Sequence, residues 1–451
     1  MQTPFVTELL LHIDRSFRAS SATEQGEALA GVLALLARIE VVPGGPYASS
    51  SGQKEEDADI GLNLIIFLFL RSHDVSLPGL SDFIDRTLSK TAPTSMVAGK
   101  ESLAELVQLY RAPQAVVPAT FEHKEEDELI QRIRVAAKEM VGGSSPEIAD
   151  AAMHVIDRTV QGNPDRQMSL MAWYVRQSLG RAGAEFSDSQ VIAFGLANIC
   201  FWTAFIIYDD FWDEDEAAEP GLLPVANLLA RHYIDFFSHT GAPDSGFRAF
   251  FHTTMDALDG ANAWEMNHCR MKVAGQIVQI PETTPDYGDY SIKYHPAAGH
   301  VLGPVSMLLE LGYRIDSDEV AQFIEYAKHY LIAMQLNDDM HDWKEDLQRG
   351  HISTTVAALL TALKEHQKEK NDIHLVDDMD MLDHLFWFDV LPSLCISVIE
   401  HVDAARKALS NLHFLEDIAP LEQFIVRNER IAREALAEQE RTVAFLHQIE
   451  K

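Results

Sequence analysis

A first group of carboxylates stands at the end of an apolar stretch, in IIYDDFWDEDE, residues 206–216. Asp209 and Asp213 are four positions apart, and Asp210 is adjacent to the first of them. Side chains four positions apart share one face of a helix. The spacing therefore predicts a row of carboxylates at a helix end, where their mutual repulsion is relieved either by water or by a bound cation.

A second group of carboxylates lies in NDDMHDWKED, residues 337–346. Asp338, Asp342 and Asp346 follow one another at intervals of four, which predicts a column of three acids along one helical face. A solvated acidic helix end is an equally good interpretation of either group alone, because an acidic protein produces such runs by chance. Two groups with metal-ligand spacing, each preceded by an apolar helix, favour a metal site.

Ligand sets made only of oxygen suit Mg²⁺, which is hard, octahedral and usually shared with substrate phosphates. Mg²⁺ ions held between two such rows would bind a diphosphate and stabilise it as a leaving group. The predicted metal ligands are all aspartates of the two groups: Asp209, Asp210, Asp213, Asp338, Asp342 and Asp346.

Two long helices must carry these groups to one place. The first begins near Ser187, and the second runs from about Ser317 to Asn337 with an apolar buried side. Nearly every other segment also repeats apolar residues at spacings of three and four, whereas Val/Thr-rich alternating runs are scarce. We therefore predict an all-α fold in which about ten helices form a bundle of the size that encloses a pocket.

Changes in composition divide the chain. Residues 41–59, VVPGGPYASSSGQKEEDAD, are rich in Pro, Gly and Ser and then charged, so they are predicted to be a flexible loop. A softer break lies near residues 92–120. We expect an N-terminal helical region at 1–120 and one large all-α domain at 121–451.

The charge of the chain limits its partners. The 451 residues carry a formal net charge of -33, and 47% of them are hydrophobic. The hydrophobic content is ordinary for a globular protein. The negative charge argues against general nucleic-acid binding and against docking on anionic membranes. An anionic substrate would need metal ions or a local basic pocket.

The three cysteines, Cys200, Cys269 and Cys395, are far apart and include no CxxC pair. They predict reduced thiols in a cytoplasmic protein rather than a disulfide framework or a zinc site. We read no signal peptide, because the first residues include acids and lack a basic n-region. The densest apolar run, residues 64–70, is too short to span a bilayer, so stable membrane insertion is not expected.

The pair of acidic groups resembles the metal motifs of class I isoprenoid synthases. DDFWD resembles the DDxxD motif of that superfamily at Asp209, Asp210 and Asp213. NDDMHDWKED resembles both the second DDxxD of prenyl diphosphate synthases and the second metal motif of terpene cyclases, although Asp342 and Asp346 depart from the Ser/Thr and Glu usual in cyclases. The resemblance covers about residues 121–450. It implies a class I isoprenoid synthase bundle, about three Mg²⁺ ions and a catalytic role for the metal-binding aspartates.

Cations distinguish the two reactions of this superfamily. Elongating enzymes typically hold isopentenyl diphosphate with a Gly-Lys-Arg run and an Arg-Arg pair. This chain keeps Arg166 without the preceding Lys, and residues 214–227, EDEAAEPGLLPVAN, contain no Arg. A second diphosphate would not bind beside so many uncompensated acids. We therefore predict a terpene cyclase, a lyase that ionises farnesyl diphosphate and closes the cation to a sesquiterpene hydrocarbon. A fainter resemblance to non-canonical humulene synthases of fungal tropolone-sesquiterpenoid pathways suggests humulene.

Two cations are candidate ligands of the diphosphate. Lys293 lies 45 residues before Asp338, near the position where cyclases carry a diphosphate-sensing Arg and elongating enzymes a Lys. Lys293 is therefore predicted to be catalytic, and a solvated surface lysine is the alternative. Arg349 lies in DLQRGHIST, which resembles the D-L-x-x-G-K-x-T/S stretch of elongating enzymes with His351 in place of Lys. Arg349 is either a phosphate ligand or a cation that stabilises a helix C-terminus.

A carbocation requires an apolar, aromatic cavity that excludes water. Trp202 and Phe205 lie one to two turns below Asp209 on its helix, and we predict that they line this cavity. Simple core packing is the alternative for both. Downstream of Lys293, the Pro and Gly residues between 296 and 304 are predicted to kink the helix.

Other functions remain open at this point. The main alternative is a prenyl diphosphate synthase, and a degenerate, non-catalytic synthase subunit is another. The pair His341-Asp342 also allows an HD-type phosphohydrolase, which would need further His and Asp ligands from other helices. The expected partner is a small prenyl diphosphate, and a homodimer is compatible with the sequence.

Overall fold

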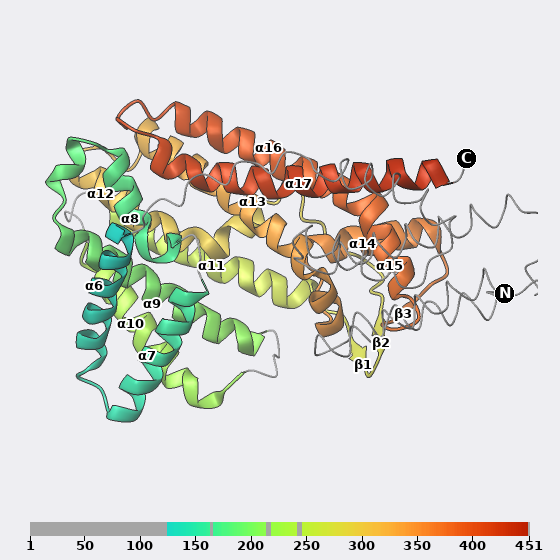
Figure 1. Ribbon diagram of the computed structural model, residues 1–451. Coiled ribbons are helices and arrows are strands. Elements are labelled where there is room, and N and C mark those ends of the chain that lie inside the picture. The colour runs from blue at the N-terminus through green and yellow to red at the C-terminus, as the bar shows by residue number, and fades with distance from the viewer. Residues whose placement is uncertain (1–123, 163–165, 213–217, 241–245, 450–451) are drawn as a thin grey trace, which may run out of the picture. The chain divides into compact units, whose positions relative to one another are not determined.

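The computed structural model describes residues 124–449 except for 163–165, 213–217 and 241–245 (Figure 1). These residues belong to Glu122–Glu450, one of the two units into which the chain divides. The predicted N-terminal region 1–120, its loop 41–59 and Asp213 lie outside the described residues.

The described residues are predominantly helical, so the all-α prediction is confirmed. The α-helices are α6 (Lys124–Val141), α7 (Pro146–Gln161), α8 (Gln167–Ser178), α9 (Asp188–Trp212), α10 (Leu223–Ser238), α11 (Phe247–His268), α12 (Leu302–Glu310), α13 (Asp318–Arg349), α14 (Thr354–His366), α15 (Met379–Leu385), α16 (Leu391–Ser410) and α17 (Ala419–Ile449). Short 3₁₀ or π turns are η2 (Ala182–Glu185), η3 (Pro220–Leu222), η4 (Ser291–Val301) and η5 (Phe386–Val390).

The longest helix of the described residues, α13, has clear signals at both ends. Ser317 is its N-cap, and the side chain of Ser317 accepts a hydrogen bond from the backbone N–H of Val320. Gly350 ends the helix in the left-handed conformation, with φ 75°, which glycine adopts without steric cost. The sequence placed the apolar part of this helix at residues 317–337, and the structure continues the helix through the whole second acidic group.

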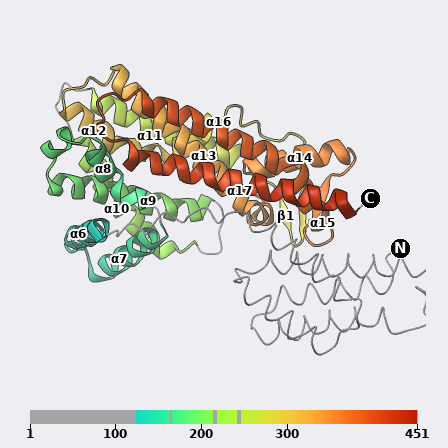
Figure 2. The same ribbon diagram turned by 45° about the horizontal axis from the view of Figure 1, so that its top comes forward.

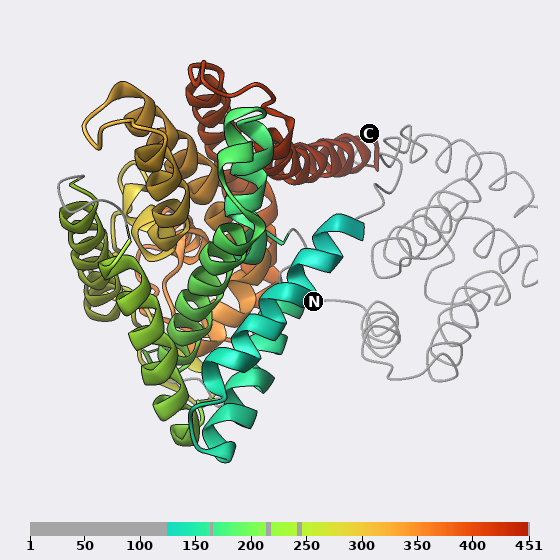
Figure 3. The same ribbon diagram turned by 90° about the vertical axis from the view of Figure 1, so that its left-hand side faces the viewer.

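Helix α13 runs through the centre of the bundle. Helices α16 and α17 lie side by side along it (Figures 1 and 2). On another side, η4 packs against α13, α11 and α9. Helices α6 and α7, cyan in Figure 3, pack against each other and against α9. The two helices that carry the acidic groups, α9 and α13, therefore share η4 as a common neighbour.

The segment after Lys293 departs from a regular α-helix, as its prolines and glycines suggested. η4 is a 3₁₀ helix with Pro296 inside it, and the chain becomes α-helical again at Leu302. A Cβ atom on Gly299 would lie 2.5 Å from the ring of Phe201. Only glycine lets η4 approach the buried Phe201 this closely.

A small antiparallel sheet was not predicted. It consists of β1 (Val273–Ala274), β2 (Ile277–Gln279) and β3 (Asp372–His374), in the order β1-β2-β3. Gly275, with φ 63°, permits the two-residue connection between β1 and β2. Strands of two or three residues are too short to produce an alternating pattern, which explains why they could not be predicted.

Two helical segments of the described residues are long and apolar enough to cross a membrane, namely Asp188–Trp212 and Met379–Ser410. The most apolar window is 61% buried in the first and 44% buried in the second. Core helices of globular proteins pass the same test of length and composition, and α9 is such a core helix here. The three cysteines are buried free thiols.

Candidate functional site

Contacts between α9 and the η4–α12 segment fix how these elements run past each other. A Cβ atom on Gly303 would lie 3.4 Å from Phe194, and one on Gly299 would touch Phe201. Between these contacts, the amide of Asn198 lies 3.1 Å from His300 Nδ1. Residue numbers rise along α9 as they fall along η4, so the two segments are antiparallel.

This register brings the acidic end of α9 to the Lys293 end of η4. From Phe201 to Asp209 the α-helix rises about 12 Å, at 1.5 Å per residue. From Gly299 back to Lys293 the 3₁₀ helix also spans about 12 Å, at 2.0 Å per residue. Asp209 is exposed and Asp210 is half-buried. The first acidic group therefore lies toward the same end of the bundle as Lys293.

Lys293 is buried and joins η4 to the second acidic group. Its Nζ donates a hydrogen bond to Asp339 Oδ1 at 3.2 Å, and only 8% of the residue is exposed. Burial by itself would lower the pKa of Lys293, but the charges of Asp339 and Glu265 raise it above the ordinary value. Lys293 is thus a permanent cation, and the alternative of a solvated surface lysine does not describe it.

Asp339 also caps α14. Its Oδ2 accepts hydrogen bonds from the backbone N–H of Thr354 at 3.0 Å and from the Thr354 hydroxyl at 2.6 Å. A carboxylate at a helix N-terminus satisfies free N–H groups and interacts well with the helix dipole. Asp339 therefore ties α13, η4 and α14 together with one side chain.

A second set of ion pairs, centred on His351, lies next to the Lys293–Asp339 pair. His351 Nε2 is 3.0 Å from Glu265 of α11, and His351 Nδ1 is 3.4 Å from Asp346. Burial would lower the pKa of His351, but the two carboxylates raise it to about 9. Burial would raise the pKa of Glu265, but His351 and Lys293 lower it to about 2. Imidazolium and carboxylate thus stabilise each other's charge at neutral pH.

The predicted column of three aspartates divides into two environments. Asp338 and Asp342 are exposed, whereas Asp346 is half-buried beside His351. Burial, followed by the negative charges of Asp346 and Glu345, raises the pKa of Asp342. A nearby cation would relieve this accumulation of negative charge.

The donor atoms available at this end suit Mg²⁺, although they do not form a closed cage. Among the residues that the structure describes, no group of three or more His, Cys, Asp or Glu side chains is arranged to hold a metal ion. Mg²⁺ usually keeps several waters and binds one or two carboxylates together with substrate phosphates. Exposed Asp209, Asp338 and Asp342 fit that mode, and Asp346 would first have to leave His351.

Arg349 lies at the C-terminal end of α13, as a dipole-stabilising cation would. Its side chain is 47% exposed, and its guanidinium is 3.8 Å from Glu345. A role as phosphate ligand remains a prediction.

An aromatic row leads along α9 to the acidic end. The ring of Trp202, half-buried, lies 4.9 Å from that of His300. The ring of Phe205, also half-buried, lies 4.6 Å from that of Phe201. The row continues from Phe205 to Trp212, whose rings are 6.4 Å apart. Apolar surface therefore extends up to the first acidic group.

Three functional candidates escaped the sequence analysis. Glu265 gave no signal because it comes from α11, far from either motif. Asp339 was visible only as one more acid within the second group, and His351 only as a departure from a family motif. Their importance depends on contacts between elements distant in sequence. His341 and Asp342 are both exposed, and no further ligand joins them among the described residues to build an HD-type site.

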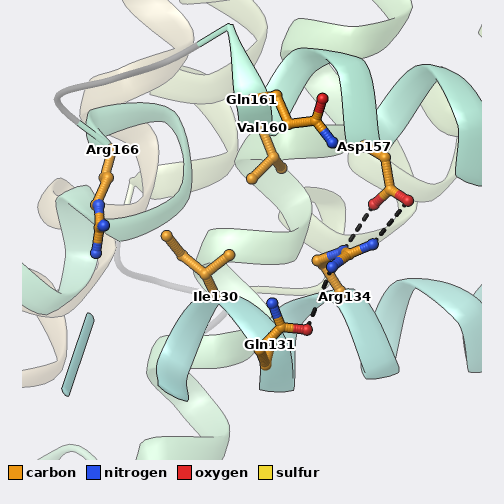
Figure 4. A pocket seen from close by; sticks show the side chains of 7 residues that line it. All are labelled: Ile130, Gln131, Arg134, Asp157, Val160, Gln161 and Arg166. Carbon is orange, nitrogen blue, oxygen red and sulfur yellow. Dashed lines mark hydrogen bonds and ion pairs between the residues drawn. The ribbon is translucent and has the colours of Figure 1, made fainter. Parts of the chain in front are cut away.

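A separate cavity of about 280 Å³ lies between α6, α7 and the start of α8 (Figure 4). Arg166 lines it, and its guanidinium is paired with Glu126 at 3.1 Å and Asp127 at 2.8 Å. Arg134, on another wall, is paired with Asp157 at 2.7 Å. Acidic side chains thus accompany both arginines of this cavity.

No family model matches the sequence, and no curated protein matches it. Solved structures that resemble it include two geranylgeranyl pyrophosphate synthetases. The one from the archaeon Geoglobus acetivorans has 14% identity and a TM-score of 0.48, covering 68% of this chain and 98% of its own. The one from Pyrococcus horikoshii has 14% identity and a TM-score of 0.46, covering 69% of this chain and 98% of its own.

A farnesyl diphosphate synthase from T. brucei is similar at the same distance, with 14% identity and a TM-score of 0.45. The match covers 68% of this chain and 97% of that one. Likenesses this distant do not distinguish chain elongation from cyclisation, and they do not address the resemblance to humulene synthases.

Proposed function

We propose that this protein is a class I isoprenoid synthase that ionises an allylic prenyl diphosphate and cyclises the resulting cation. The observation that carries the proposal is the register of α9 against η4. The register supports a position of Asp209 and Asp210, at the end of α9, toward the same end of the bundle as the buried cation Lys293, which is itself bonded to Asp339 of the second acidic group. Acids on two helices and one fixed cation are what a diphosphate bound through metal ions requires.

The roles follow from the chemistry of each group. Asp209, Asp210 and Asp213 on one side and Asp338 and Asp342 on the other would hold Mg²⁺, which supplies charge neutralisation to the leaving diphosphate. Asp346 would join them if it left His351. Lys293 has three ammonium donors, and its bond to Asp339 uses one of them. That bond holds the ammonium in place, so that it can offer charge to a diphosphate oxygen without reorganising.

The apolar part of the site would surround the carbocation. Trp202 and Phe205 present aromatic faces that stabilise positive charge and exclude water. Farnesyl diphosphate is the proposed substrate and a sesquiterpene hydrocarbon such as humulene the proposed product. Both rest on the family resemblance of the motifs.

Chain elongation is the second candidate, because the similar solved structures bear the names of elongating enzymes. That reaction would need a second anion site. The arginine best placed by sequence to build one, Arg166, is paired with Glu126 and Asp127. Such pairing weakens attraction for a diphosphate and supports cyclisation.

The deciding experiment incubates the full chain with C10, C15 and C20 allylic diphosphates and Mg²⁺, with and without isopentenyl diphosphate. Cyclic products formed from one substrate alone would support the proposal. Longer diphosphates that appear only with isopentenyl diphosphate would establish elongation instead. If no diphosphate is released under any condition, the protein is not a synthase for these substrates.

A further inference from the structure

Two histidines from distant parts of the chain meet where α13 packs against α16. His329 Nδ1 lies 2.8 Å from His401 Nδ1, and the ring centroids are 5.1 Å apart. Both residues are half-buried. His329 lies about 14 Å before Asp338 along α13, at 1.5 Å per residue. The pair is therefore separate from the candidate site.

Only some protonation states allow this contact. A neutral imidazole has one N–H donor and one acceptor nitrogen, whereas an imidazolium has two donors and no acceptor. Two Nδ1 atoms at 2.8 Å form a hydrogen bond only if one of them carries a proton and the other does not. The contact is thus favourable with two neutral rings or with one charged ring, and two charged rings repel each other.

Charged neighbours decide which ring is protonated first. Glu325 Oε2 lies 3.5 Å from His329 Nε2, so its charge favours protonation of His329. Asp289, which precedes η4, favours protonation of both rings, and Lys328 opposes it. Burial lowers the pKa of His329. Burial, followed by the charge of His329, lowers the pKa of His401 to about 4. His401 is therefore the ring that stays neutral and accepts the hydrogen bond when His329 is charged.

The two rings connect elements that are distant in sequence. Helices α13 and α16 lie side by side (Figures 1 and 2). The ring of Tyr290, at the start of η4, packs against that of His401 with centroids 6.1 Å apart. A movement of His401 would therefore change its packing against both α13 and η4.

We propose that the His329–His401 hydrogen bond is an acid-sensitive link between α13 and α16. The link is closed while at least one of the two rings is neutral, and it opens when both rings are protonated. The proposal does not rest on the proposed function, because it concerns only the pairing of two helices.

A crystal structure of the unaltered full chain at neutral pH tests the closed link. We expect the two Nδ1 atoms at hydrogen-bond distance, about 2.7–3.2 Å. Rings that are separated, or turned so that other atoms face each other, would overturn the proposal.

The link should make stability depend on pH. The pKa values of both rings are lower in the folded protein than the ordinary 6.5, so the unfolded chain binds protons more readily. The stability that the rings contribute is complete above pH 6.5 and declines as the pH falls toward 4. Between pH 7 and 5, the equilibrium constant of unfolding should rise about tenfold more in the unaltered protein than in His401→Gln.

Urea denaturation at several pH values measures this difference. His413→Gln changes an exposed histidine that follows α16, so it should keep the pH dependence of the unaltered protein. Equal rises in the unaltered protein and in His401→Gln would overturn the proposal.

A double variant distinguishes a link from two independent histidines. If the rings share a hydrogen bond, the effects of His329→Gln and His401→Gln on the pH dependence should not add when the two are combined. Additive effects would show two independent groups and contradict the link. The combination of His401→Gln with His413→Gln is the control, and its effects should add. If a variant does not fold, the crystal structure of the unaltered chain decides.

Discussion

Two histidines, the buried His300 and the half-buried His351, mark two opposite environments in this bundle. His351 lies between Glu265 and Asp346, and these carboxylates raise its pKa to about 9. His300 lies among apolar side chains with the neutral amide of Asn198, and burial lowers its pKa to about 3. Burial acts in the same direction on both rings, so their neighbours decide their charge.

The comparison extends to the surroundings of each ring. Around His351 the structure gathers fixed charges of both signs, including Lys293 bonded to Asp339. Around His300 it gathers aromatic rings and close contacts between α9 and η4, with a cavity of only about 10 Å³. A reaction that separates diphosphate from a carbocation needs both environments in one protein.

The protein should lose the most stability when one member of the buried Lys293–Asp339 pair is removed. Asp339→Asn leaves the Lys293 ammonium buried without its carboxylate, and we expect the free energy of unfolding to fall by about 3–5 kcal/mol. Urea denaturation measures this change.

The neighbouring exposed aspartate is the matched control. Asp338→Asn should change the free energy of unfolding by no more than about 0.5 kcal/mol. Equal losses in the two variants would show that the Lys293–Asp339 link is not the stabilising feature of this end.

Although Asp338→Asn should hardly change the stability, it should strongly reduce the activity. Asp338→Asn and Asp209→Asn each remove a proposed metal ligand, so diphosphate release should fall about 100-fold or more, equivalent to about 2.7 kcal/mol. Steady-state release of diphosphate from farnesyl diphosphate measures it. Glu345→Gln changes an exposed acid of the same helix that is not among the predicted metal ligands, and it should keep its rate. An unchanged rate in either Asp variant contradicts the two-helix metal site.

The apolar environment should respond to added volume. Gly299→Ala puts a methyl group 2.5 Å from the Phe201 ring, and such overpacking costs about 1–3 kcal/mol. Gly303→Ala, whose methyl group would lie 3.4 Å from Phe194, should cost less. If thermal unfolding shifts equally in both, the close approach of η4 to α9 is not specific to Gly299.

A further expected effect is a pH dependence of stability carried by His300. Its pKa is lower in the folded protein than the ordinary 6.5, so the unfolded chain binds the proton more readily. Stability from this group is complete above pH 6.5 and declines as the pH falls toward 3, by at most about 1.4 kcal/mol per pH unit. Urea denaturation between pH 7 and 5 should show a shallower slope in His300→Gln than in the unaltered protein, and identical slopes would mean that His300 is protonated in the fold.

Much of the helical framework could be predicted from local signals. Apolar periodicity placed α9 and the lead-in of α13, and the Pro and Gly residues between 296 and 304 predicted the irregular helix after Lys293. These signals work because each reflects the conformational preference of a few adjacent residues. The β1-β2-β3 sheet was missed because its strands have only two or three residues and because β3 pairs with β2 from almost a hundred residues away.

Within the site, the sequence alone determined which residue types stand at helical spacing. It determined that Asp209 and Asp338 begin acidic rows at the ends of apolar segments, and that the chain is too acidic to bind an anion without a cation. Spacing along one helix carries this information, because it depends only on the helical repeat.

Only the tertiary structure decided which of these groups meet. Lys293 pairs with Asp339 and not with the exposed acids. Asp346 pairs with His351, which also pairs with Glu265 of another helix. The physical reason is that a buried charge must find an opposite charge wherever the packing of helices supplies one. Such partners come from distant parts of the chain, so no local pattern could have named them.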